Sequence, residues 1–459
     1  MAGSGIVALP TAIVQCQLWL GLVLLFVMAT IGIVSAVLLG KCWVILVRRF
    51  PAYRTHCRKP YAEIGMRALG PKAKYLVMFC VNFTLFGVTT VFLLLSAKNI
   101  RDFLLAFFNY DLDFCLIILI VALILLPITL PKSPKDFWPV IFIGMLCTGV
   151  AFWLIIVGSA LDYSECSAAR EMPQLKMSNL LLALGTIRFT YGGHSGFPTI
   201  QHDMKDPSNF TKASVLAISL ITAFNYLVVT ISSLSYGNSL RDSVINSMQT
   251  LWLQQTVNLM ITLHCLLTVT LVINPLNQSV EELFQIPQNF GYKRVALRTA
   301  IMGLVVFTAE SIPSFGAVLN LIGGSTVTMT SAVFPCLFYL YLSAGEKKSK
   351  EALYLGSEEP VTFKEMVART NKYVLLAVGA LIALSLLIGV IATAVAIDSL
   401  SSTHFHPPCY LKGFFSFESE VPAANKTFSY VNCCGAGQNI SRHPEYGLDI
   451  CTAPQLDFY

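Results

Sequence analysis

Long apolar stretches, separated by short charged or turn-forming stretches, dominate the chain. Runs such as Phe114 to Leu126 and Val374 to Ile397 hold no charged residue. A bilayer core of about 30 Å is crossed by about 20 apolar residues in a helix, and lipid offers backbone groups no outside partner. The pattern therefore predicts an all-α integral membrane protein. The predicted spans are Met1 to Gln17, Leu20 to Val47, Tyr75 to Ala97, Phe114 to Leu130, Trp138 to Leu161, Asn179 to Ile200, Ser214 to Ser235, Leu251 to Leu276, Thr299 to Ile312, Phe315 to Leu342 and Val374 to Ile397.

Composition agrees with lipid as the solvent. Of the 459 residues, 55% are apolar and only 12% are charged, about half the charged share of an ordinary soluble domain. No charge precedes Lys41, so the basic start of a cleavable signal peptide is missing and we expect the first span to stay in the protein. No basic stretch carries interleaved aromatic residues, so we expect membrane lipid as the surroundings and no nucleic-acid partner.

The basic residues assign the sides of the membrane. Twenty-one of the 31 lysines and arginines fall in the alternate loops that begin with 48–74, eight fall in the other loops, and two lie inside spans. Because cytoplasmic loops carry the excess of lysine and arginine, this predicts a cytoplasmic 48–74 loop and an extracellular or luminal tail.

The sequence divides into residues 1–397, an eleven-helix region, and the tail 398–459. The tail chemistry fits an oxidising compartment, because it holds four cysteines and two glycosylation sequons, at Asn425 and Asn439. We expect the remaining cysteines to be small apolar fillers. The disulfide candidates, whose pairing stays open, are Cys409, Cys433, Cys434, Cys451 and, in a loop on the same side, Cys166.

Two spans carry glycines followed by proline at equal spacing, Gly5 to Pro10 and Gly193 to Pro198. Both residue types weaken a helix, and a break survives in lipid only where it lines a cavity. These spans are the first of each half if spans one to five and six to ten are repeats, and five spans per repeat make the halves inverted. The alternative is close packing between helices through small residues.

Broken helices would supply complementary groups for an α-amino acid. N–H groups at a positive helix end suit a carboxylate, and we expect them at Gly3, Ser4 and Gly5. Freed carbonyls at Tyr191, Gly192, Gly193 and His194 suit an ammonium group. Phe189 and Tyr191 would wall the side-chain pocket, or pack the bundle.

The motifs resemble the amino acid/auxin permease family of transmembrane amino acid transporters. They are Gly-Ser-Gly-Ile-Val-Ala-Leu-Pro at 3–10, Tyr-Gly-Gly-His-Ser-Gly-Phe-Pro-Thr-Ile-Gln at 191–201, Asp-Met-Lys-Asp-Pro at 203–207, Asn-Pro-Leu at 274–276 and Ile-Gly-Gly-Ser at 322–325. The resemblance implies a LeuT-like fold with an inverted five-plus-five repeat and an eleventh helix. It also implies proton- or sodium-coupled movement of amino acids by alternating access.

Two features depart from the family pattern. Family members carry a cytoplasmic region and half of helix one before the glycine motif, whereas Met1 stands two residues before Gly3, so the resemblance implies an incomplete first helix. Arg188 lies one turn before the expected break in the sixth span, where a neutral residue is expected.

Four residues are candidates for ion coupling. Arg188 could replace a coupling cation or bind a carboxylate, or be neutralised by carbonyls of the unwound stretch. His194 could carry a proton or be structural. Thr268 and Thr270 could ligate sodium or bond their own helix. We expect His264 to satisfy a neighbouring backbone group.

Other function classes fit less well. The motifs of metalloproteases, hydrolases and phosphate loops are missing, so we expect no enzyme, no cofactor and no metal beyond a coupling ion. We therefore predict a secondary active symporter for small neutral amino acids, with protons preferred to sodium, in the plasma or endolysosomal membrane. The alternative is a transporter-like amino acid sensor with little flux. The sequence does not set the oligomeric state.

Overall fold

The computed structural model describes residues 2–55, 57–130, 138–287, 289–351, 361–402, 410, 431, 433–443 and 451. Within these residues the chain is helical, and its only extended pairings are two isolated bridges in the tail, Val431 with Cys451 and Cys434 with Ile440. The expected all-α membrane fold is confirmed.

Each of the eleven predicted spans falls on helical structure. The helices are α1 (Ala2–Gln15), α2 (Leu18–Arg49), α3 (Pro60–Leu69), α4 (Pro71–Phe108), α5 (Phe114–Thr129), α6 (Trp138–Cys166), α7 (Met177–Thr190), α8 (Phe197–Asp203), α9 (Phe210–Tyr236), α10 (Leu251–Leu283), α11 (Tyr292–Ser311), α12 (Phe315–Ile322), α13 (Phe334–Glu351), α14 (Phe363–Arg369) and α15 (Lys372–Ser402). Short 3₁₀ turns connect them at Pro51–Arg54 (η1), Gly193–Ser195 (η2), Pro207–Asn209 (η3), Gly237–Ser239 (η4) and Val244–Ser247 (η5). In the described part of the chain, seven helices are long and apolar enough to cross a bilayer uninterrupted.

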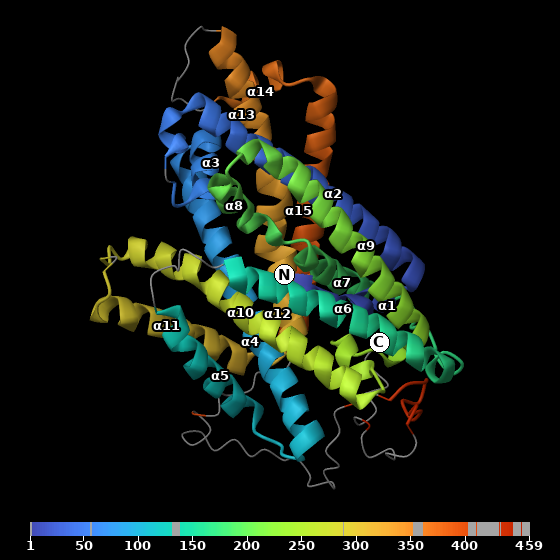
Figure 1. Ribbon diagram of the computed structural model, residues 1–459. Coiled ribbons are helices and arrows are strands. Elements are labelled where there is room, and N and C mark those ends of the chain that lie inside the picture. The colour runs from blue at the N-terminus through green and yellow to red at the C-terminus, as the bar shows by residue number, and fades with distance from the viewer. Residues whose placement is uncertain are drawn as a thin grey trace.

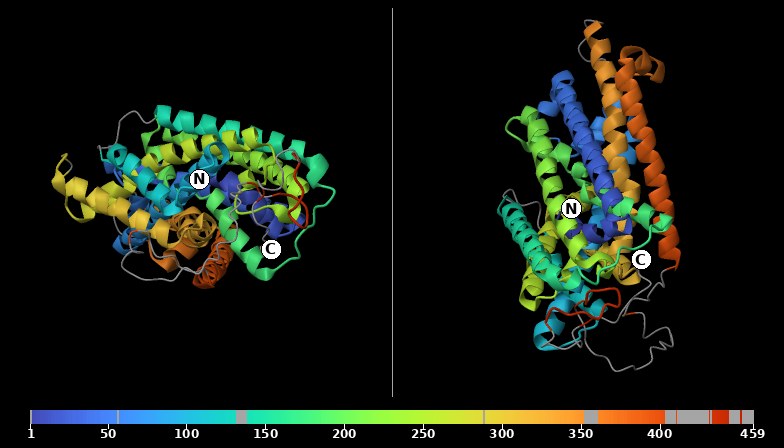
Figure 2. Two further views of the ribbon diagram at one scale, coloured as in Figure 1. Left: turned by 90° about the horizontal axis from the view of Figure 1, so that it is seen from below. Right: turned by 90° about the vertical axis from the view of Figure 1, so that its right-hand side faces the viewer.

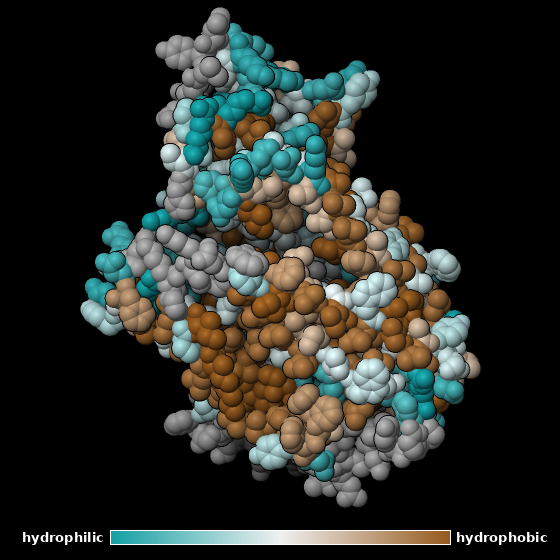
Figure 3. All heavy atoms as spheres, in the orientation of Figure 1, coloured by the Kyte–Doolittle hydropathy of each residue, from teal (hydrophilic) through white to brown (hydrophobic). Residues whose placement is uncertain are grey.

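The bundle has two chemically different ends. Helices α3 and α14 lie at one end with the charged end of α13, and the described part of the tail lies at the other (Figures 1 and 2). Hydrophilic residues gather at the end that holds α3 and α14, and apolar side chains cover much of the middle of the same face (Figure 3). We call these the basic end and the tail end.

Equivalent helices of the two halves lie together. The first helices, α1 and α7, pack against each other, and so do the second helices, α2 and α9. This is the pairing expected of two repeats related by a two-fold axis. The largest buried cluster runs between α4, α6 and α10, and includes Phe92, Phe152 and Val257.

Local sequence explains several helix ends. Asp113 caps α5 by accepting a hydrogen bond from the Cys115 N–H at 2.9 Å. Gly70, with φ of 85°, separates α3 from α4, because the left-handed region favours glycine. Thr362 and Glu365 form a reciprocal capping box at the start of α14.

Helix one differs from the expectation of a break at residues 3–10. Helix α1 is continuous from Ala2 to Gln15 with Pro10 inside it. Its glycines instead permit close approach to neighbouring helices, as the contacts below show. The tenth span holds an unexpected feature, since π-helical turns at Gly323–Val327 (η6) and Met329–Val333 (η7) join α12 to α13. Such turns often occur at functional sites.

Candidate functional site

The sixth span is interrupted where the sequence predicts. Helix α7 ends at Thr190, η2 covers Gly193–Ser195, and α8 begins at Phe197. Short-range bonds hold the turn, from the Gly192 N–H to the Phe189 carbonyl at 3.0 Å and from the Gly196 N–H to the Gly193 carbonyl at 3.2 Å. The regular helical ladder therefore stops before Tyr191 and resumes after Gly196.

His194 connects the interrupted segment, residues 191–196, to α2 by hydrogen bonds. Its Nε2 lies 3.1 Å from the Gly32 carbonyl and 3.0 Å from Ser35 Oγ, and the ring contacts the Phe197 ring at a tilt, with 4.7 Å between centroids. Because a carbonyl only accepts, we assign the ring proton to Nε2. His194 is fully buried, and its bond to the Gly32 carbonyl connects the unwound segment to α2.

The glycines of α1 allow two neighbouring helices to come close. A Cβ added at Gly3 would lie 2.3 Å from Cδ2 and 2.5 Å from Nε2 of His264 on α10. A Cβ added at Gly5 would lie 2.7 Å from Oγ1 and 2.9 Å from Cγ2 of Thr190, the last residue of α7. Ser4, between them, is fully buried. The start of α1, the interruption after α7 and the middle of α10 therefore meet at one place.

One ring nitrogen of His264 faces the place where α1, α7 and α10 meet. Its Nδ1 lies 3.0 Å from the Gly144 carbonyl and 2.9 Å from Thr148 Oγ1 on α6, so we assign a proton to Nδ1. The unprotonated Nε2 is then on the edge that faces Gly3. The bond to the Gly144 carbonyl is the backbone contact that the sequence predicts for His264.

The remaining predicted residues separate into two groups. Phe189 and Tyr191 are buried, and Tyr191 packs over Gly32 of α2. Thr268 Oγ1 donates to the His264 carbonyl and Thr270 Oγ1 donates to the Leu267 carbonyl, both at 2.7 Å. Both threonines thus bond their own helix, and the Thr268 hydroxyl also lies 3.5 Å from His264 Nε2.

Arg188 is the most unusual of the predicted residues. Its side chain is 2% exposed, and Nη1 and Nη2 have no hydrogen-bond partner among the residues that the structure describes. Among the described residues, no backbone carbonyl of the unwound stretch accepts a hydrogen bond from these two nitrogens. His194 and Cys336 lie close enough to interact with its charge.

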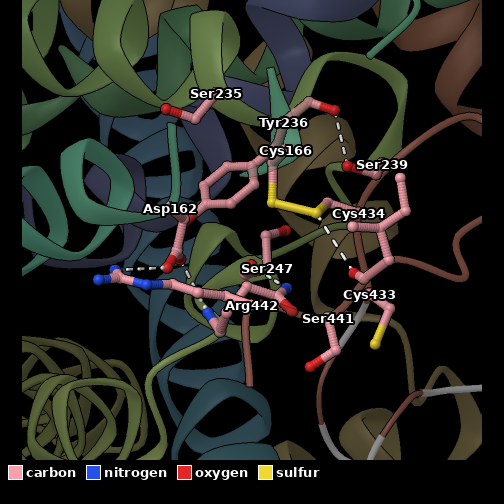
Figure 4. Close-up of a disulfide and its surroundings, with 12 residues drawn as sticks. Asp162, Cys166, Ser235, Tyr236, Ser239, Ser247, Cys433, Cys434, Ser441 and Arg442 are labelled. Atoms are coloured by element: carbon pink, nitrogen blue, oxygen red, sulfur yellow. Dashed lines mark hydrogen bonds and ion pairs between the residues drawn. A yellow bond between two sulfur atoms is a disulfide. The ribbon is translucent and has the colours of Figure 1, made fainter. Parts of the chain in front are cut away.

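A disulfide and an ion pair attach the tail to the helices at the tail end of the bundle. Disulfides join Cys166 to Cys434 and Cys433 to Cys451. Arg442 reaches the fully buried Asp162 at 3.3 Å (Figure 4). That carboxylate also accepts bonds from the Tyr236 hydroxyl at 2.7 Å and the Gln249 N–H at 2.9 Å.

Two further tail predictions have mixed outcomes. Cys115, expected to be an apolar filler, is disulfide-bonded, and its place at the first turn of α5 was the missed signal. Asn439 is exposed on the described part of the tail, as a glycosylation site must be. Asn425 and Cys409 lie outside the described residues.

At the basic end, two glutamates outside the membrane-spanning helices form ion pairs with lysines. Burial alone would raise the pKa of Glu63, but hydrogen bonds from Lys74 at 2.6 Å and from the Tyr53 hydroxyl at 2.7 Å bring it below its usual value. Glu365 has its pKa lowered to about 2, first by a hydrogen bond from Lys348 and then by the capping bonds of Thr362. These contacts connect α3 to α4 and α13 to α14.

An interrupted helix that meets a second helix and buried polar groups inside a membrane bundle is the architecture of secondary transporters. A match to a known family identifies the kind of transporter. Residues 1–392 match the family described as transmembrane amino acid transporter protein, and the chain belongs to that family. The matched family and relatives are transporters and not enzymes.

The relatives cover most of the chain. Amino acid transporter AVT1J of Arabidopsis thaliana is 24% identical over 75% of this chain and 80% of its own length. Amino acid transporter AVT1I of the same plant is 24% identical over 87% of this chain and 92% of its own. A solved structure, the manganese transporter of Eremococcus coleocola, gives a TM-score of 0.49 with 9% identity over 88% of this chain and 87% of that one.

Proposed function

We propose that the protein is a proton-coupled symporter that moves small neutral amino acids by alternating access. The observation that carries this proposal is the contact between the glycines of α1, the interruption after α7 and His264 of α10. N–H groups of Gly3 to Gly5 would bind the substrate carboxylate, and carbonyls of residues 191–194 would bind its ammonium group.

His264 is the proposed proton carrier. The bond from Nδ1 to the Gly144 carbonyl fixes the ring and leaves the Nε2 lone pair directed at the proposed carboxylate position. Imidazole titrates near neutral pH, and a substrate carboxylate beside it would favour the protonated form. Proton uptake and substrate binding would thus support each other. Sodium coupling through Thr268 and Thr270 has less support, because both hydroxyls are committed to their own helix.

The tail lies on the extracellular or luminal side in this proposal. Its disulfides are typical of an oxidising compartment, and the opposite end carries the basic loops. Both the plasma membrane and an endolysosomal membrane satisfy these conditions.

The test is uptake of radiolabelled alanine, serine and glycine into proteoliposomes with independent pH and sodium gradients. We expect uptake driven by an inward proton gradient and indifferent to sodium. His264→Gln should abolish proton-driven accumulation while retaining exchange of labelled for unlabelled substrate, and Thr270→Ala should behave as the wild type. Binding without flux under every gradient would favour the sensor, and accumulation driven only by sodium would refute proton coupling.

A further inference from the structure

Arg188 carries a charge that the described protein does not neutralise. A charged side chain near the centre of a bilayer costs about 2.5 to 3.5 kcal/mol even on insertion scales, so buried charges are normally paired. Arg298 shows that this chain follows the rule elsewhere. Its side chain is fully buried and pairs with Glu281 at 2.6 Å. Arg188 is as deeply buried, yet no described carboxylate pairs with it and both terminal nitrogens lack partners.

The site around Arg188 is distinct from the proposed substrate site. Residues 188 and 190 are about 200° apart around a helix, so their side chains leave α7 on nearly opposite faces. Thr190 faces Gly5 of α1. Arg188 lies near Cys336 at the start of α13, a helix that packs against α2, α3 and α15. An anion held by Arg188 therefore lies on the other face of α7 from the glycines.

We propose that Arg188 is the centre of a buried binding site for a small inorganic monovalent anion, with chloride as the physiological occupant. The two terminal guanidinium nitrogens are buried without a described hydrogen-bond acceptor, and Arg188 lies two residues before the end of α7, where the sixth span is interrupted. A halide fits this chemistry because it accepts several N–H bonds and cancels the charge without a second polar group to satisfy. The neighbouring π-helical turn η7 packs against η2, so the site lies between the two irregular spans.

The direct test is the thermal unfolding of the purified full chain in detergent. Sodium chloride is titrated from 1 to 150 mM, in place of sodium gluconate at constant ionic strength. An anion that binds only the folded state raises the unfolding midpoint by mass action, here by about 2 to 4 °C. Arg188→Gln should remove the chloride dependence, and Arg188→Lys should weaken it. Arg101→Gln, which changes a half-exposed arginine, is the matched control and should keep it.

A second measurement keeps the proposal testable if Arg188→Gln does not fold. Crystals of the wild-type protein grown with bromide should show an anomalous peak beside the Arg188 guanidinium. No chloride dependence in the wild type, or an equal dependence in Arg188→Gln, would overturn the proposal, as would bromide elsewhere only. Protection by alanine that requires Arg188, without any chloride effect, would make the anion the substrate carboxylate and overturn the halide assignment. Because these measurements do not depend on flux, they test the anion site independently of the proposed proton coupling.

Discussion

Replacement of Gly5 by alanine tests whether the close contact between α1 and α7 builds the substrate site. The new Cβ would stand 2.7 Å from Oγ1 and 2.9 Å from Cγ2 of Thr190, where ordinary contacts begin near 3.4 Å. The helices must therefore separate by about half an ångström or more, and overpacking of this kind costs about 1 to 3 kcal/mol. We expect Gly5→Ala to lower uptake at least tenfold, because the proposed carboxylate site depends on this spacing.

Thr190→Ala removes the two nearest of the three atoms that the new Cβ would meet and leaves only Thr190 Cβ, at 3.1 Å. It also removes the 3.0 Å bond from the Thr190 hydroxyl to the Thr186 carbonyl, a loss of about 1 kcal/mol. In a double-mutant cycle, Gly5→Ala should thus cost much less in a Thr190→Ala background, both in unfolding temperature and in uptake. Gly149→Ala on α6 is the matched control, because nothing lies within 4 Å of its added Cβ. Full activity of Gly5→Ala, or no relief from Thr190→Ala, would refute the reasoning.

Three other predictions concern the ends of the bundle. Cys166→Ser should lower the free energy of unfolding by about 2 to 5 kcal/mol, because the bond to Cys434 closes a loop of 268 residues. Thermal unfolding with and without reductant measures this loss. Equal unfolding midpoints in the wild type and the variant would contradict it. Asp162→Ala should destabilise more than Asp162→Asn, because asparagine keeps an acceptor for the bonds that converge there, and equal unfolding midpoints would count against that account. The pKa of Glu365 is lowered to about 2 in the folded protein, from the ordinary carboxyl value of 4.5. Its contact with Lys348 therefore stabilises the packing of α14 on α13 above pH 4.5, and this stabilisation is lost as the pH falls from 4.5 toward 2. Hydrogen exchange of residues 363–369 should accelerate only below pH 4.5.

The spans were readable from the sequence because lipid requires long apolar helices whatever their tertiary contacts. The interruption at residues 191–196 was readable too, since glycine and proline occur together there. The same residue types at 3–10 did not break α1. The difference is packing: Gly3 and Gly5 are covered by His264 and Thr190, so their lack of side chains serves close approach rather than unwinding.

Three features could not be derived from one sequence. The π-helical turns at 323–333 are rich in glycine, serine and threonine, and small residues of this kind are equally typical of close packing between regular membrane helices. The cysteine pairs join positions as far apart as 268 residues, and spacing alone does not choose among them. The unpartnered state of Arg188 depends on which acidic residues the fold brings near it, and only coordinates reveal that the described part of the chain brings none.

The two halves of the sixth span are attached to different parts of the bundle. Helix α7 is packed tightly on the tenth span, where a Cβ on Gly323 would lie 2.0 Å from the Gly185 carbonyl. Helix α8 is tied instead to α2, because Gln201 Nε2 donates to the Gly40 carbonyl at 3.0 Å and His194 holds the Gly32 carbonyl. Close backbone contact of this kind cannot slide without a clash, whereas the residues between the two halves have no regular helical ladder to break. We therefore expect any relative movement of α2 and the tenth span to be absorbed at residues 191–193, between the end of α7 and the attachment of His194 to α2, beside the proposed substrate and anion sites.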